Sequence, residues 1–151
     1  MDLKFLKKPE DAYILPEEDL DNNAELPESF DAREQWPNCP SISYIRDQSS
    51  CGSCWAVSSA EVMSDRACIE SDGRIKSHLS DSDIMTCCTD CGEDDGSYGG
   101  CKGGYLHKAF RYAMHKGVCT GGRYLEKSHL SDSDIMTCCT DCGEDDGSYG
   151  G

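Results

Sequence analysis

Gln48 and Cys54 have residue types and a spacing suited to covalent chemistry. Cys54 precedes Trp55 in the run Gln48-Ser-Ser-Cys-Gly-Ser-Cys-Trp55. A thiolate attacks a carbonyl carbon far more readily than a thiol, so reactive cysteines generally need a pKa below the usual value of about 8.5. The side chain of Gln48 could donate an N–H to the resulting oxyanion, beside the backbone N–H of Cys54. The pair predicts nucleophilic attack on an acyl group.

The element that must position Cys54 is a helix. Small and apolar residues recur at helical spacing after the cysteine and predict one buried face over about residues 53–68: Ala56, Ala60, Met63 and Ala67. The N-terminus of a helix favours negative charge because its first N–H groups are unpaired. A partner imidazole normally completes the activation of such a cysteine. We therefore expect Cys54 at the start of this helix.

Two other interpretations of the same cysteines compete with a catalytic role. Cys51 and Cys54 have the C-x-x-C spacing of a thioredoxin-type redox pair. In redox proteins the tryptophan usually precedes the motif and a βαβ pattern surrounds it. Here Trp55 follows, and no apolar strand comes before. The second interpretation makes both cysteines structural, which we favour for Cys51 and not for Cys54.

Two further helices follow from local signals. Ser80-Asp-Ser-Asp83 resembles a capping box, with Asp in place of the usual Glu, and predicts a short helix to about residue 86. Leu106, Phe110 and Met114 recur every four residues and predict a helix over 105–116. Gly117 is the residue expected to end it. Residues 87–102 form a predicted loop, and residues 1–25 are expected to be extended or disordered.

A colinear series of motifs accompanies the cysteine and covers residues 26–126. It consists of Leu26–Pro40, Ile45–Gln48, Cys51–Trp55, Ser64–Cys68, the Cys87-Cys88 doublet, Cys101–Tyr105 and Gly117–Tyr124. In this order the motifs resemble the cathepsin B-like cysteine peptidases of the papain family. The resemblance implies an α+β papain-like fold whose active site lies between a helical and a β-rich domain. It also implies that this disulfide-rich chain covers mainly the helical N-terminal (left) domain and lacks the β-rich second domain.

The resemblance assigns roles residue by residue. Cys54 resembles the nucleophile, Gln48 the oxyanion-hole glutamine, and Gly103 and Gly104 the backbone rim on which substrate lies. Glycine lets another backbone approach closely. Taken alone, the two glycines would favour an ordinary turn before the next helix, but beside the cysteine motif the rim is preferred. The implied function is cysteine-type endopeptidase activity on protein or peptide substrates, with no cofactor and no metal.

The chain departs from the family pattern beside these residues. Ser49 stands where the family usually has glycine, and Lys102 stands where asparagine is common. A positive φ is awkward for serine. If the loop requires that conformation at Ser49, the substitution strains it.

The general base is not found among the histidines present. The family's His and Asn lie roughly 130–150 residues beyond the cysteine. His78, His107, His115 and His129 are all too close to Cys54. His107 and His115 are expected on the surface of their helix. We therefore expect this chain to be inactive by itself, because it has a nucleophile without its base.

An internal copy follows the family-like region. Residues 76–100 recur without change as residues 127–151. Solenoid repeats usually need three or more units. Two identical copies favour a recent exon duplication, a splice variant or an assembly error, and residues 127–151 are expected to have no independent fold. The domain prediction is a residual propeptide-like leader at 1–25, a peptidase half at 26–126, and the copy at 127–151.

The charge of the chain is local. The formal net charge is −15, and it arises from residues 1–25 and the two copies. This argues against nucleic acids and anionic membranes as partners, where basic patches dominate. No stretch approaches the ~20 apolar residues of a membrane-spanning helix. The N-terminus is too short and too charged for a signal peptide, so a lysosomal or secreted location is implied by the resemblance alone. Residues 1–25 resemble the tail of an inhibitory propeptide, which is compatible with a disordered acidic leader.

Twelve cysteines in 151 residues indicate an oxidising compartment. Spacing alone does not fix their connectivity. The resemblance implies three disulfides: Cys39–Cys68, Cys51–Cys101 and Cys88–Cys91. Cys139–Cys142 would be the copied version of the last. Besides Cys54, this leaves Cys87, Cys119 and Cys138 unpaired, and we expect these three thiols to cause misfolding or intermolecular disulfides.

An alternative function is a non-enzymatic metal-binding or thiol-rich module. Cys87, Cys88 and Cys91 offer three soft ligands, and the copy offers the equivalent set Cys138, Cys139 and Cys142. Zinc sites prefer separated cysteine pairs at known spacing, and this is not one of the standard patterns. The endopeptidase interpretation is therefore preferred.

Overall fold

The structure, a computed structural model, describes residues 5, 8–12, 27–92 and 100–121. In chain order its helices are α1 (Ala32–Gln35), η3 (Pro40–Ser43), α2 (Cys54–Glu70), α3 (Asp81–Cys87) and α4 (Leu106–Lys116). Within the described ranges the only strand-like pairings are two isolated bridges, Leu79 with Thr120 and Gly92 with Gly104. The helical character predicted for this half of a papain-like fold is confirmed.

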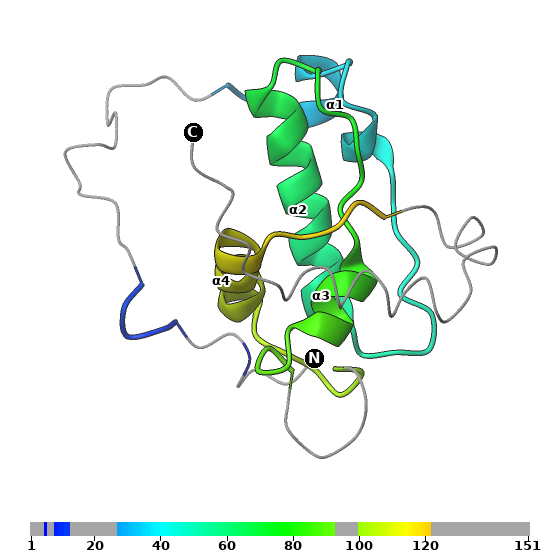
Figure 1. Cartoon of the computed structure of the whole chain (residues 1–151). Coiled ribbons are helices and arrows are strands. Elements are labelled where there is room, and N and C mark those ends of the chain that lie inside the picture. The colour runs from blue at the N-terminus through cyan, green and yellow to red at the C-terminus, as the bar shows by residue number, and fades with distance from the viewer. Residues whose placement is uncertain (1–4, 6–7, 13–26, 93–99, 122–151) are drawn as a thin grey trace.

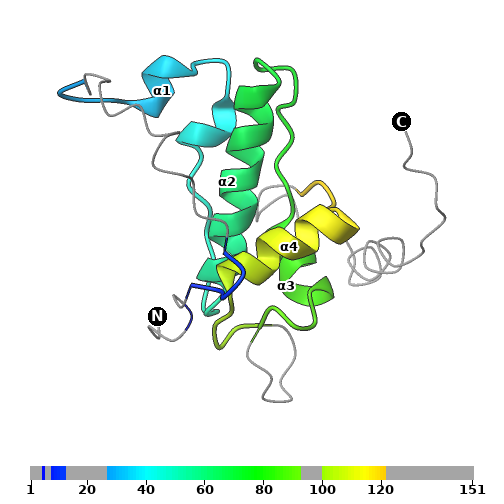
Figure 2. The ribbon, with the colours of Figure 1, turned by 90° about the vertical axis from the view of Figure 1, so that its left-hand side faces the viewer.

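The long helix α2 is the centre of the molecule. The helices α3 and α4 lie against its N-terminal half, and α1 and η3 lie near its C-terminal end (Figures 1 and 2). Its predicted bounds of 53–68 agree with the observed Cys54–Glu70 within two residues. Trp55, Ala56 and Ala60 are fully buried. Buried hydroxyls on α2 bond back to the helix, as when Ser59 donates to the Trp55 carbonyl at 2.7 Å.

The start of α3 differs from the expected capping box in one detail. Ser80 caps the helix as predicted, and its Oγ accepts from the N–H of Asp83 at 3.1 Å. The Asp83 carboxylate, however, accepts from the N–H of Cys119 at 2.9 Å. The Ser80 N–H donates to the Cys119 carbonyl at 2.8 Å. The cap therefore ties α3 to the segment that follows α4.

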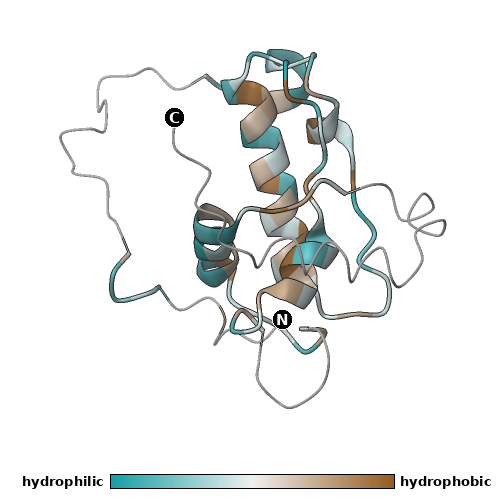
Figure 3. Ribbon diagram, viewed as in Figure 1, coloured by the Kyte–Doolittle hydropathy of each residue, from teal (hydrophilic) through white to brown (hydrophobic). Residues whose placement is uncertain are grey.

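The helix α4 ends as its sequence predicts. Gly117 is the C-cap residue with φ 81°, in the left-handed region that favours glycine. Of the α4 residues, Ala109 is fully buried, and much of the α4 ribbon is hydrophilic (Figure 3). One apolar side of α4 therefore packs on the core while basic side chains face solvent.

The core joins α2, α3 and α4 through a cluster of buried side chains: Trp55, Ala56, Ala60, Ile84, Cys88, Cys91 and Ala109. The structure contains three disulfides with the pairing that the resemblance implies: Cys39–Cys68, Cys51–Cys101 and Cys88–Cys91. The Cys88–Cys91 disulfide is buried in this core and fixes the chain that follows α3 against α2.

The expectation that Cys87 is unpaired is wrong. Cys87 is disulfide-bonded, and none of the other described cysteines is its partner. The physical reason is that pairing depends on which chain segments lie beside the end of α3, and a motif comparison does not contain that information. Cys138 and the rest of the copy at 127–151 lie outside the described residues.

Two short helices, α1 and η3, were not predicted. Asp31 caps α1, because its carboxylate accepts from the N–H of Arg33 at 2.9 Å. The side-chain hydrogen bond from Arg33 lowers the pKa of Asp31 from 3.8 to about 2. Helices of four residues are too short for a periodic pattern to reveal them. Among the described residues, no helix is long and apolar enough to cross a membrane.

Candidate active site

Cys54 is the first residue of α2, as predicted. It is half-buried and is not part of a disulfide. The preceding residue, Ser53, makes no side-chain capping bond, and the first turn contains no acidic residue. The N–H groups at this helix end therefore have neither a side-chain cap nor a local acid competing for them. Such an end favours negative charge that develops during a reaction.

One cavity of about 330 Å³ brings the predicted site residues together. It is lined by Gln48, Cys54, Gly103 and Gly104, and also by Phe5, Gly52, Trp55, Cys101 and Lys102. The residues come from the loop before α2, the start of α2 and the segment before α4. Motifs about fifty residues apart in sequence thus meet around a single thiol.

The side chain of Gln48 is oriented by the loop that follows it. Its amide nitrogen donates to the Cys51 carbonyl at 2.9 Å. A primary amide carries two N–H donors, so this bond fixes the side chain while using one of them. The geometry holds Gln48 at the cavity wall without consuming its full donor capacity.

The loop before α2 is attached to the segment before α4 at two points. The Cys51–Cys101 disulfide is one. The other is the Gly52 N–H, which donates to the Cys101 carbonyl at 2.7 Å. A Cβ at Gly52 would lie 2.2 Å from that carbonyl oxygen, so only glycine fits. The sequence analysis did not single out Gly52, although its place between the two motif cysteines was the available signal.

Ser49 adopts the strained conformation that its sequence position suggested. Its φ is 55°, in the left-handed region where a non-glycine residue is uncommon. Its N–H donates to the Asp47 carboxylate at 2.7 Å. This local bond offsets part of the backbone cost next to Gln48.

The two glycines of the predicted rim have different surroundings. A Cβ at Gly104 would lie 2.5 Å from the Trp55 indole, so Gly104 is required by packing. Gly103 has φ 117°, and a Cβ there would lie 2.3 Å from the ring of Phe5. The face of Gly103 is therefore already covered by an aromatic side chain. Their role in binding substrate stays a prediction.

Phe5 is a cavity residue that the sequence analysis missed. Its side chain is only 3% exposed, and its ring meets the ring of Tyr105 edge-on at 5.0 Å. Farther along the leader, Asp11 forms an exposed ion pair with Arg111 of α4 at 2.6 Å. The leader was expected to be extended or disordered. Instead Phe5 lies in the cavity and Asp11 lies against α4, and an aromatic residue in a polar segment was the signal.

The described residues place no histidine at the cavity. The ring of His78 lies against that of Tyr44 at 5.0 Å, and the ring of His107 lies 5.7 Å from that of Tyr105. His115 is exposed on α4, while His107 is only half-buried. His129 lies outside the described residues. None of the three described histidines lines the cavity that contains Cys54.

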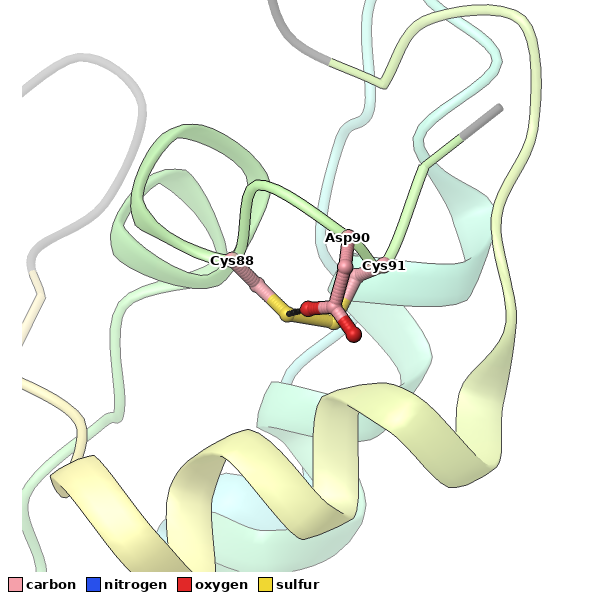
Figure 4. A group of neighbouring side chains, drawn as sticks. All are labelled: Cys88, Asp90 and Cys91. Atoms are coloured by element: carbon pink, nitrogen blue, oxygen red, sulfur yellow. Dashed lines mark hydrogen bonds between the residues drawn. A yellow bond between two sulfur atoms is a disulfide. The ribbon is translucent and has the colours of Figure 1, made fainter. Parts of the chain in front are cut away.

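A second cluster could have suggested a metal site. Donor atoms of Cys88, Asp90 and Cys91 lie within 4.8 Å of one another (Figure 4). The two sulfurs form a disulfide, so neither is available as a thiolate ligand. Because Cys87 is disulfide-bonded as well, the thiol-rich metal module is not supported in the described copy of this sequence.

Comparison with known proteins gives consistent results. Residues 26–127 match the model of the papain family cysteine protease. Cathepsin B-like cysteine proteinase 1 of Ostertagia ostertagi is 45% identical over 140 residues, which cover 91% of this chain and 39% of the relative. Cathepsin B-like cysteine proteinase 4 of Caenorhabditis elegans is 52% identical over 103 residues, covering 68% of this chain and 29% of the relative.

A solved structure agrees with these sequence matches. The structure of proCathepsin B S9 from Trypanosoma congolense has a TM-score of 0.59 and 44% sequence identity, covering 72% of this chain and 34% of that chain. This chain spans at most about two fifths of the length of the relatives it matches. The matched part includes the loop before α2, α2 itself and the segment before α4.

Proposed function

The chain belongs to the papain family of cysteine proteases, and on that premise we propose that it carries the nucleophile half of a cathepsin B-like cysteine endopeptidase. The observation that supports this most is the cavity at the start of α2, where Cys54, Gln48 and Gly103 line one space. Its substrates would be proteins or peptides. The disulfides favour an oxidising compartment, lysosomal or secreted.

The chemistry follows from the positions of two donors and one sulfur. The Cys54 thiolate attacks the carbonyl carbon of the peptide bond, and the carbonyl oxygen becomes an oxyanion. The backbone N–H of Cys54 and the free amide N–H of Gln48 donate to that oxyanion. Collapse expels the amine, which takes up a proton, and leaves a thioester on Cys54. Water then hydrolyses the thioester and regenerates the thiol.

Both halves of this reaction need a group that accepts and returns a proton. An imidazole normally does this, and removing such a group from a triad lowers the rate by several orders of magnitude. Since none of the described histidines lines the cavity, and the family's His lies roughly 130–150 residues beyond the cysteine, we infer that none of them is this imidazole. A polypeptide of the 151 residues alone is then expected to be inactive.

The leader is proposed to act as an inhibitor of the same site. Phe5 is buried in the cavity and covers Gly103, which is where an extended substrate would lie. The similar solved structure is described as a proenzyme. Phe5 would thus block the cavity in cis until the leader is released.

A chimera tests the function directly. Residues 1–126 would be joined to the part of the Ostertagia relative that follows the matched region, and hydrolysis of a fluorogenic dipeptide amide would be measured after removal of residues 1–25. We expect the chimera to exceed the 151-residue chain by at least about a thousandfold. Cys54→Ser should abolish the gain, while Ser58→Ala, one turn along α2, should keep it. A folded chimera without hydrolysis would contradict the proposal.

A further inference from the structure

Residues 76–92, which contain α3, contact the rest of the molecule through side chains that all recur in the second copy. Those that pack in or against the core are apolar: Leu79, Ile84, Met85, Cys88 and Cys91. They pack into a groove formed by α2, α4 and residues 118–121, which we call the α3 groove. The fully buried Ile84 is the centre of this contact. The corresponding residue of the copy is Ile135.

The residues that this segment itself contributes to its polar contacts are also all duplicated. Leu79 donates its N–H to Ser64 at 2.9 Å and accepts from Arg46 at 2.7 Å. Arg46 also pairs with Asp81 at 2.9 Å. At the other end the Cys91 carbonyl accepts from the N–H of Tyr105 at 2.9 Å. Because the copy is identical over 25 residues, it can make each of these bonds.

The backbone pairing at Thr120 would close a shorter loop with the second copy than with the first. Leu79 is bridged antiparallel to Thr120, and the Gly121 N–H donates to the His78 carbonyl at 2.7 Å. Leu79 precedes Thr120 by 41 residues, whereas the equivalent Leu130 follows it by ten. The antiparallel direction is the one that a hairpin through residues 122–128 would have. Closing the shorter loop costs less chain entropy.

We propose that the α3 groove accepts either copy, so that residues 127–143 can replace residues 76–92 of the same chain. No covalent bond has to break if the choice is made during folding. The duplication thereby gives this fold two interchangeable α3 segments, beside the chain that leads to Cys101 and the Cys54 cavity.

Aspartate substitutions at the duplicated position test the exchange in the full chain. An unpaired carboxylate in the core is severely destabilising. We expect Ile84→Asp and Ile135→Asp each to keep a cooperative thermal transition, with the midpoint within about 10 °C of the parent. The double variant should lose the transition. Ala60→Asp is the matched control, because this fully buried residue has no second copy and its substitution alone should abolish the transition.

Hydrogen exchange identifies which copy is docked. Peptides that include the unique flanks Arg74-Ile75 or Leu125-Glu126 distinguish the copies by mass. In Ile84→Asp, backbone protection should move from residues 78–91 to residues 129–142. Loss of the transition in Ile84→Asp, its retention in the double variant, or no protection in the second copy would each overturn the proposal. Gel filtration over a tenfold dilution should give a monomer. A concentration-dependent dimer would instead show that the copy comes from another molecule.

Discussion

The two ends of α2 are built in different ways. At the C-terminal end, the N–H and carbonyl groups of the backbone are hydrogen-bonded by residues only a few positions away. The Gly73 N–H donates to the Cys68 carbonyl at 2.9 Å, and the Ser71 N–H donates to the Ala67 carbonyl at 3.2 Å. Ser71 Oγ also donates to the Cys68 carbonyl at 3.1 Å. Cys68 itself is fully buried and bridged to Cys39.

At the N-terminal end, the loop before α2 is held in place by a residue that is distant in the sequence. Ser53 gives no side-chain cap, the residues from Gln48 to Ser50 are exposed, and the loop is held by Cys101 from fifty residues away. A reactive helix end needs unused N–H groups and a rigid frame at the same time, and distant attachment supplies the frame without consuming the N–H groups. This difference is the one expected if the N-terminal end of α2 serves chemistry, as we propose, and the C-terminal end serves stability.

The largest expected effects come from opening the disulfide at either end. Cys51→Ala with Cys101→Ala, and Cys39→Ala with Cys68→Ala, should each lower the free energy of unfolding by about 3–4 kcal/mol, because the loops they close are 50 and 29 residues long. Urea denaturation measures both. Only the first pair should also speed alkylation of Cys54 by iodoacetamide, since only there does the cavity lose its frame. Equal alkylation rates in the two variants would remove the distinction between the ends.

The next effect concerns Phe5, which lines the cavity at the N-terminal end of α2. Phe5→Ala removes a buried ring of the kind whose burial contributes about 2 kcal/mol. We expect alkylation of Cys54 to become about tenfold faster, measured by mass spectrometry of the peptide that contains it. Phe30→Ala is the matched control, because Phe30 is 61% exposed and packs on Trp36 beside α1. If both variants react at the parent rate, Phe5 does not shield the thiol.

Sequence reasoning succeeded where a signal is local. The spacing of alanines gave α2, Ser80 gave the start of α3, and Gly117 gave the end of α4. The gathering of Gln48 and Cys54 with the glycines before α4 came from the family resemblance, because spacing alone does not say which loops meet.

Other features depend on contacts between distant segments. The burial of Phe5 against Gly103 joins two segments about a hundred residues apart. The Asp83 carboxylate was expected to cap its own helix and instead bonds the Cys119 N–H. The disulfide state of Cys87 depends on a neighbour that no local pattern names. In each case a tertiary contact decided between alternatives that the local sequence permits equally.

Both ends of α2 also carry a non-glycine residue with positive φ, which allows a matched test. Ser49 has φ 55° and Asp72 has φ 53°. Glycine relieves the clash of Cβ in this region but loses more entropy on folding. Ser49→Gly should raise the free energy of unfolding by about 0.5–1 kcal/mol in urea denaturation. Asp72→Gly should change it by only a few tenths of a kcal/mol, because aspartate tolerates this region better. An equal gain at Asp72 would show that the strain is not specific to the reactive end.

The smallest effect lies between the two ends, at Glu61. Burial raises the pKa of Glu61 above 4.5, with Asp65 and Asp81 adding to the shift and Arg46 opposing it. A carboxyl with a raised pKa in the folded state contributes stability below its unfolded pKa and loses it as the pH rises through the folded value. At pH 7 the charged group is therefore unfavourable.

Glu61→Gln should accordingly stabilise the fold at pH 7 and give no gain near pH 4. Solvent screening of this half-buried side chain limits the gain to less than about 0.5 kcal/mol. The urea midpoints at the two pH values measure it, and Glu28→Gln, at an exposed position outside α2, controls for general charge effects. A gain that is the same at both pH values would show that Glu61 lowers the stability of the fold through its packing and not through its charge. The middle of α2 would then resemble its C-terminal end, where packing decides, more than its N-terminal end, where charge is meant to develop.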